Sequence, residues 1–154
     1  MKGRARFGEA ASADWIPGPD QMDRSRLAAA MHRWGYDGLE IAASGDHLDL
    51  RRADEDPAYL RSRLEVLDRY GLKVFAISNH LAGQAVCDSP IDFRHQAIVR
   101  DYVWGDGDPE GVRQRAADDM KRAARVARGL GADTVVGFTG SSIWQYVAMF
   151  PPVD

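Results

Sequence analysis

Three times in this chain an amphipathic helix ends at a glycine and is followed at once by a short apolar strand. The sequence predicts helices over residues 23–34, 56–71 and 108–129, and strands over Gly38–Ala42, 72–78 and 133–139. Helices that alternate with strands favour right-handed crossovers and a parallel sheet. The pattern therefore predicts an α/β fold with about three parallel strands and three main helices. Proteins of this class carry their functional residues at the carboxyl ends of the strands.

The first helix is expected to bury an apolar stripe at helical spacing. Its members are Leu27, Ala30, Met31 and Trp34.

Three segments lie outside the repeated pattern. Residues 1–22 contain no strand-like run and are predicted to form an irregular or mobile tail before a folded part over 23–154. Residues 43–55 are predicted to be a polar loop. Residues 79–108 form a connection long enough to be typical of a functional or disordered segment. We expect this connection to be an insertion beside the carboxyl end of the sheet.

Charge and cysteine content limit the classes of function. The 154 residues suit one domain, and 20 Lys and Arg against 23 Asp and Glu give a net charge of −3. Nucleic-acid-binding domains are usually basic, so no nucleic-acid partner is expected. The single cysteine, Cys87, cannot form an internal disulfide, which favours a cytoplasmic location. No apolar run approaches the roughly 18 residues of a membrane span, so no membrane partner is expected.

Two predicted strands place polar side chains where a site could form. Glu40 faces away from Leu39 and Ile41, and a carboxylate inside a closed sheet needs a partner or the mouth of a site. An edge-strand position explains Glu40 equally well. His80 follows the second strand and could bind a hydroxyl group, a phosphate or a metal, or make a structural hydrogen bond in a loop. Gln84 offers both a donor and an acceptor.

The segment after the third strand is the other candidate. Residues 138–142 combine a glycine with small hydroxyl side chains, and their backbone amides could hold an anion. Trp144 could stack on the apolar face of a sugar or serve as a packing aromatic. His47 and His95 fit structural roles in loops better than ligand binding.

Three stretches of the chain, considered together, resemble a known family. The chain resembles the sugar phosphate isomerase/epimerase group of the xylose-isomerase-like TIM barrels over about residues 24–152. The stretches are Trp34-Gly35-Tyr36-Asp37-Gly38-Leu39-Glu40-Ile41, Ser78-Asn79-His80-Leu81-Ala82-Gly83-Gln84 and Gly131-Ala132-Asp133-Thr134-Val135-Val136.

The resemblance implies a partial (β/α)8 barrel that is not closed. Such barrels have about 250 residues, so this chain would supply the second, third and fourth strands of an N-terminal half. In the family a divalent metal (Mn, Mg, Co or Zn) is held by Glu, Asp, His and Glu from later strands, and two glutamates transfer a proton beside a carbonyl. No position here matches those four ligands. The resemblance therefore assigns no catalytic or metal residue and carries over only substrate-binding residues, namely Glu40, His80, Gln84 and Trp144.

The leading interpretation is a fragment of a metal-dependent sugar (phosphate) isomerase or epimerase, with a sugar or sugar acid as substrate and no activity or metal of its own. A small non-catalytic α/β binding module is one alternative. A barrel similar to the apurinic endonucleases is another, which the acidic charge balance disfavours. Self-association of the isolated chain through exposed sheet edges is expected.

Overall fold

A three-stranded parallel sheet organises the protein. The computed structural model describes residues 24–45 and 47–147. The strands β1 (Gly38–Ala42), β2 (Lys73–Ser78) and β3 (Val135–Val136) lie in the order β1-β2-β3. Both pairings are parallel, and within the described residues β1 and β3 are open edges. The predicted α/β class with three parallel strands in an unclosed sheet is therefore confirmed.

The helices of the described residues vary widely in length. Aspartate caps begin the two longest ones. Asp56 accepts hydrogen bonds from the backbone of Ala58 and Tyr59, and Asp108 accepts one from Gly111. The helices are α1 (Arg24–Trp34), α2 (Leu50–Glu55), α3 (Pro57–Asp68), α4 (His80–Ala85), the 3-10 helix η2 (Phe93–Ala97), α5 (Asp101–Trp104), α6 (Pro109–Gly129) and α7 (Trp144–Val147).

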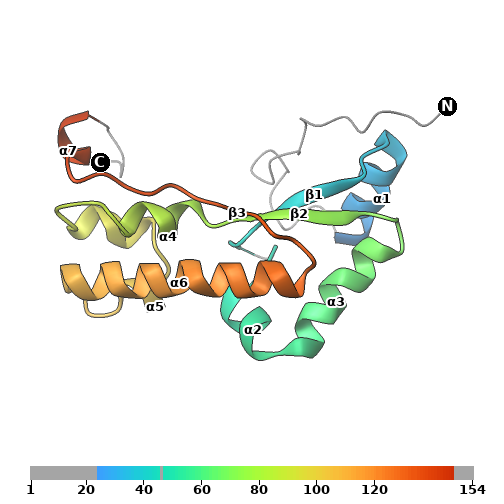
Figure 1. Ribbon diagram of the computed structural model, residues 1–154, viewed down its shortest axis with the longest axis horizontal. Coiled ribbons are helices and arrows are strands. Elements are labelled where there is room, and N and C mark those ends of the chain that lie inside the picture. The colour runs from blue at the N-terminus through green and yellow to red at the C-terminus, as the bar shows by residue number, and fades with distance from the viewer. Residues whose placement is uncertain (1–23, 46, 148–154) are drawn as a thin grey trace.

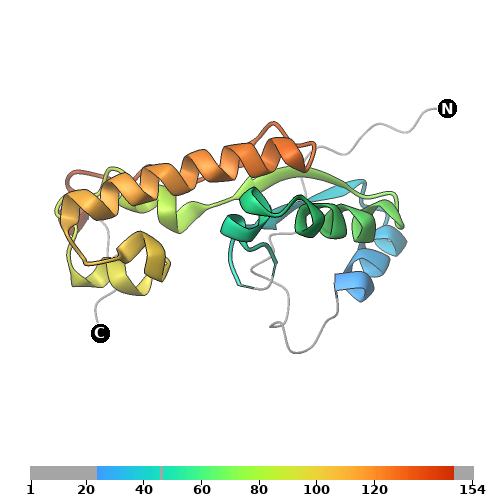
Figure 2. The same cartoon turned by 90° about the horizontal axis from the view of Figure 1, so that it is seen from below.

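Helix α6 connects the two ends of an elongated molecule. In Figure 1 the sheet and helices α1 to α3 occupy one end, and α4, α5 and α7 occupy the other. Figure 2 shows α6 running along the molecule past both groups. The side chains of α6 follow this division, since Ala123, Val126 and Ala127 belong to an apolar core beside the sheet, whereas Val112 and Ala116 belong to a second core beside α4 and α5.

The segment 43–55 is not the polar loop that the sequence predicted. Its second half forms α2, which Asp49 caps by accepting a hydrogen bond of 3.0 Å from the backbone nitrogen of Arg52. Leu50 and Ala53 are one helical turn apart and both are buried. A helix of six residues with one cap and two buried apolar residues gives too short a pattern to stand out from its polar neighbours.

The apolar stripe predicted for the first helix is correct only in part. Ala30 and Met31 are buried, but Trp34 is 63% exposed and Ala28 is buried instead. Trp34 is the last residue of α1, and its ring meets Tyr36 edge-on with the ring centroids 6.5 Å apart.

The third strand is shorter than the predicted range of 133–139. Only Val135 and Val136 pair with β2, opposite Ile77 and Ser78. The chain then leaves the sheet to pack against α4. The long connection 79–108 folds into α4, η2 and α5 and contributes Ile91, Val99 and Val103 to the second core.

The predicted tail over 1–22 and its boundary with the folded part lie outside the described residues. Among the residues that the structure does describe, no helix is both long and apolar enough to cross a membrane.

Candidate functional site

Helix α4 begins at the carboxyl end of β2 and carries two of the predicted site residues. His80 and Gln84 are four residues apart, so they lie on the same face of the helix, one turn from each other. Both residues are half-buried. The Nδ1 atom of His80 is buried and has no hydrogen-bond partner among the described residues. This nitrogen is an unused donor or acceptor at the end of a parallel strand.

The segment that follows β3 lies directly against α4. A side chain at Gly83 would collide with the carbonyl oxygen of Phe138, and one at Gly140 would collide with the carbonyl oxygen of Gln84. Gly140 also has a φ of +77°, which favours glycine. The two backbones therefore approach closely only because both positions lack a side chain. As a result the rings of His80 and Phe138 lie 4.8 Å apart, and Phe138 remains 51% exposed.

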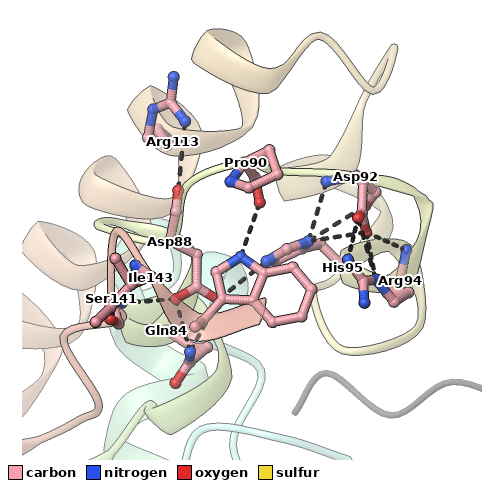
Figure 3. Close-up of polar contacts among 10 residues, drawn as sticks. Gln84, Asp88, Pro90, Asp92, Arg94, His95, Arg113, Ser141 and Ile143 are labelled. Atoms are coloured by element: carbon pink, nitrogen blue, oxygen red, sulfur yellow. Dashed lines mark hydrogen bonds and ion pairs between the residues drawn. The ribbon is translucent and has the colours of Figure 1, made fainter. Parts of the chain in front are cut away.

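A buried carboxylate joins the two segments, as Figure 3 shows. Asp88 is fully buried, and its Oδ1 accepts hydrogen bonds from Gln84 Nε2 at 2.8 Å and from the backbone of Ser141 at 2.7 Å. Its Oδ2 accepts from Gln84 Nε2 at 2.8 Å and from His95 Nε2 at 3.0 Å. Asp88 therefore ties α4 to the segment after β3.

Trp144 belongs to the same neighbourhood but is only 1% exposed. Its Nε1 donates to the carbonyl oxygen of Pro90 at 2.9 Å, and its ring meets the His95 ring edge-on at 5.2 Å. The guanidinium of Arg94 lies 4.0 Å from the Trp144 ring. The hydrogen bond from Arg94 holds the pKa of Asp92 below its usual range. In this arrangement Trp144 anchors the segment after β3, and stacking on a ligand would require its ring to become exposed.

Glu40 lies apart from the other three predicted residues. It is half-buried on β1 and is paired in register with Ala76, two residues before the strand ends. Its carboxylate makes no hydrogen bond or ion pair with any described residue. The structure thus brings His80 and Gln84 together on α4 and links Trp144 to Gln84 only through His95 and Asp88. It leaves Glu40 on the neighbouring strand.

A second buried aspartate supports the end of β2, and the sequence predictions did not include it. Asp119 on α6 is fully buried, and its Oδ2 accepts from Asn79 at 3.0 Å and from Arg100 at 2.7 Å. Its Oδ1 accepts from the hydroxyl of Tyr102 at 2.6 Å and from Arg122 at 3.1 Å. Burial, together with the hydrogen bond to Asp119, raises the pKa of Tyr102 to about 12.

One signal in the sequence could have identified this aspartate. Asp119 stands at helical spacing from Ala116 and Ala123, on the apolar face of α6. A charged residue on a buried face requires partners. Asp88 has no comparable signal, because its partner Ser141 is 53 residues away.

The described residues do not fit the divalent metal that the resemblance implies. Among residues 24–45 and 47–147 no group of three or more His, Cys, Asp or Glu side chains is arranged to hold a metal ion. The carboxylates of Asp88 and Asp119 are instead occupied by donors from the protein.

Comparison with known proteins agrees with the fold. A search of curated proteins found no match. The family model described as the xylose isomerase-like TIM barrel matches residues 28–148, which include all three strands and the whole of the α4 neighbourhood. The open parallel sheet with its covering helices is what a part of such a barrel looks like. The chain therefore belongs to the family of xylose isomerase-like TIM barrels.

Proposed function

We propose that this chain supplies the sugar-binding part of a sugar isomerase or epimerase whose full-length form moves a proton next to a carbonyl. The observation that carries the proposal is the α4 face at the end of β2. There His80 Nδ1 is unpaired but buried, so the ring must turn to present it to a ligand, and the exposed ring of Phe138 lies beside it. Sugars combine hydroxyl groups with apolar ring faces, so a polar group next to an aromatic ring suits them.

The proposal gives the chain a role in binding and leaves the proton transfer to residues of the full-length form. Glu40 is a half-buried carboxylate without a partner among the described residues, and it can accept a hydrogen bond from a second hydroxyl group. The divalent metal expected for the family has no fitting group of side chains in the described part of the chain. Binding and catalysis are therefore separable in experiments on this protein.

The first test measures binding. The chain is titrated with D-xylose, D-glucose, D-fructose and D-gluconate, and saturation-transfer NMR reports the bound sugar. We expect His80→Ala to weaken binding about tenfold, the effect of losing about one buried hydrogen bond. The control is His32→Ala, because His32 is an exposed residue of α1. Absence of saturable binding for all four sugars would contradict the proposal.

The second test measures chemistry. The chain is incubated with D-fructose and Mn²⁺ in D₂O, and mass spectrometry follows deuterium incorporation into the sugar. We expect no incorporation from the chain alone. Metal-dependent incorporation would show that catalytic groups lie within these 154 residues.

A non-catalytic binding module is the second candidate. It is favoured by the same observation that the described residues contain no cluster suited to a metal. This alternative also predicts sugar binding. It differs in predicting that a full-length form of the protein does not catalyse the exchange of carbon-bound protons. Deuterium incorporation by a full-length form decides between the two candidates.

A further inference from the structure

The side-chain amide of Gln84 is held in one orientation. Its Nε2 lies 2.8 Å from both carboxylate oxygens of Asp88, which is fully buried. A carboxylate can only accept hydrogen bonds, so the part of the amide that faces it must be the nitrogen. In Figure 3 the amide nitrogen of Gln84 faces Asp88, and the amide oxygen lies on the opposite side.

The carboxylate is itself fixed by groups on two other segments. Ser141 donates its backbone N–H to Oδ1, and His95 Nε2 lies 3.0 Å from Oδ2. The other ring nitrogen of His95 lies 3.2 Å from both the backbone nitrogen and the carbonyl oxygen of Asp92. Because a carboxylate can only accept, Nε2 of His95 carries a proton and donates it to Asp88. Reversal of the Gln84 amide would turn its oxygen toward an anionic group that already has other donors.

The amide oxygen of Gln84 is thus a free acceptor on the α4 face that carries His80. Oε1 accepts no hydrogen bond from any described residue. It lies one helical turn from His80, whose Nδ1 is also unpaired. Because the amide cannot flip, the Gln84 oxygen cannot be replaced at this position by the amide nitrogen. The site therefore accepts a hydrogen bond from an O–H or N–H group and does not suit an anionic oxygen.

We propose that Gln84 Oε1 is a fixed acceptor for one hydroxyl group of a neutral sugar, and that Asp88 and His95 are positioning residues that set its polarity. This inference rests on the proposed sugar-binding function of the same surface. It adds a restriction on the ligand, because the phosphate or carboxylate group of an acidic sugar is excluded from the position next to Gln84. An uncharged polyol segment fits there instead.

The binding experiment uses whichever of D-xylose, D-glucose, D-fructose and D-gluconate binds most tightly, together with its monodeoxy and monodeoxyfluoro analogues. Fluorine in place of a hydroxyl group cannot donate. At one position of the sugar we expect the fluoro analogue to bind about tenfold more weakly than the parent, as weakly as the deoxy analogue. Asp88→Asn lets the Gln84 amide face either way. In this variant the fluoro analogue modified at the same sugar position should therefore bind only about twofold more weakly than the parent sugar. Gln84→Leu removes the acceptor and should abolish the difference.

Matched controls come from α6. Asp118→Asn changes an exposed aspartate, and Gln114→Leu changes an exposed glutamine. Both control variants should keep the wild-type preference for the parent sugar over its fluoro analogue. If Asp88→Asn also keeps it, or if the wild-type protein shows no such position on the sugar, the inference is wrong.

A measurement on the unmodified chain covers the case in which Asp88→Asn does not fold. Hydrogen exchange of the side-chain amides of Gln84 and Gln114 is compared by NMR. Each signal is assigned by its disappearance in the corresponding variant, Gln84→Leu or Gln114→Leu. We expect exchange at Gln84 Nε2 to be at least about tenfold slower than at the exposed Gln114, because Gln84 is bonded to a buried carboxylate. Equal rates would overturn the fixed orientation. Failure of all four sugars to bind contradicts the proposed function, and this exchange measurement then decides the orientation by itself.

Discussion

Two buried aspartates organise the polar interior beside the carboxyl end of β2, and each accepts hydrogen bonds from both neighbouring and distant residues. Asp119 is surrounded by Arg100, Arg122, Tyr102 and Asn79. A buried carboxylate is tolerated only when such partners replace the lost water.

Tyr102 makes this network sensitive to alkaline pH. Its pKa is raised from 10.0 to about 12, first by burial and then by the hydrogen bond to Asp119. A pKa that is higher in the folded than in the unfolded state stabilises the fold fully below the unfolded value, and this contribution is lost as the pH rises through the folded value. We therefore expect the free energy of unfolding to fall between about pH 10 and about pH 12. Urea denaturation at a series of pH values measures it.

The variant Tyr102→Phe isolates this effect. It keeps the aromatic ring near Arg51 but removes the hydroxyl group, so stability should be lower at neutral pH and should decline less steeply in alkali. Tyr146→Phe is the control, because Tyr146 is 80% exposed. Identical alkaline slopes for Tyr102→Phe and the wild-type protein would show that Tyr102 does not cause the loss.

Individual site residues were predictable where the sequence carries them next to a strand, and not where three-dimensional contacts define them. His80 and Gln84 follow β2 directly, so their location was accessible from the strand pattern. The amide orientation of Gln84 was not, because it depends on Asp88, and Asp88 depends on His95 and Ser141. The periodicity of apolar residues in the sequence does not indicate hydrogen bonds between such separate segments.

At the scale of elements, the position of α4 depends on two glycines in different segments. Gly83 allows the backbone of α4 to touch the carbonyl of Phe138, and Gly140 allows the following segment to touch the carbonyl of Gln84. This close contact explains why β3 ends after two residues: the chain turns from the sheet toward α4. The pairing of His80 with Phe138 is a consequence of the same contact.

Gly83→Ala should separate these two elements. The added methyl group meets backbone atoms of Phe138, which cannot move aside as a flexible side chain can. We expect a loss of about 2 kcal/mol in the free energy of unfolding and weaker sugar binding. Gly129→Ala is a matched control at the end of α6, where the new methyl group meets only the flexible end of Leu60. Urea denaturation of both variants checks the prediction, and similar stabilities would contradict it.

One strand and the longest helix were predicted well. Strand β1 has the predicted bounds, and α6 begins after its cap Asp108 and ends at Gly129, as expected. The short helices were missed, because four to six residues contain too little periodicity to separate a helix from a loop. They are α2, α4, η2, α5 and α7. Helices α2, α4 and α5 pack against α6, and the local sequence does not show these contacts.

At the scale of the whole molecule, the sheet remains exposed along its margins. Among the described residues β1 and β3 have no partner on their outer sides. A bulge in the β1–β2 register leaves Phe75 without a counterpart on β1, and this side chain is 51% exposed. Trp34, at the end of α1, is 63% exposed. Open parallel edges beside large apolar side chains favour association with another chain.

We therefore predict that this chain self-associates through the sheet. Sedimentation velocity should show a mean mass that rises with concentration, and Phe75→Ser should shift this rise to at least about fivefold higher concentration by removing apolar area from the contact. Phe93→Ser is the matched control, because Phe93 is 74% exposed on η2 and lies away from the sheet. An equal effect of both variants would indicate non-specific hydrophobic association that does not involve the sheet. A single monomeric species at all concentrations, with sharp cooperative unfolding, would show that the open edges are protected in solution.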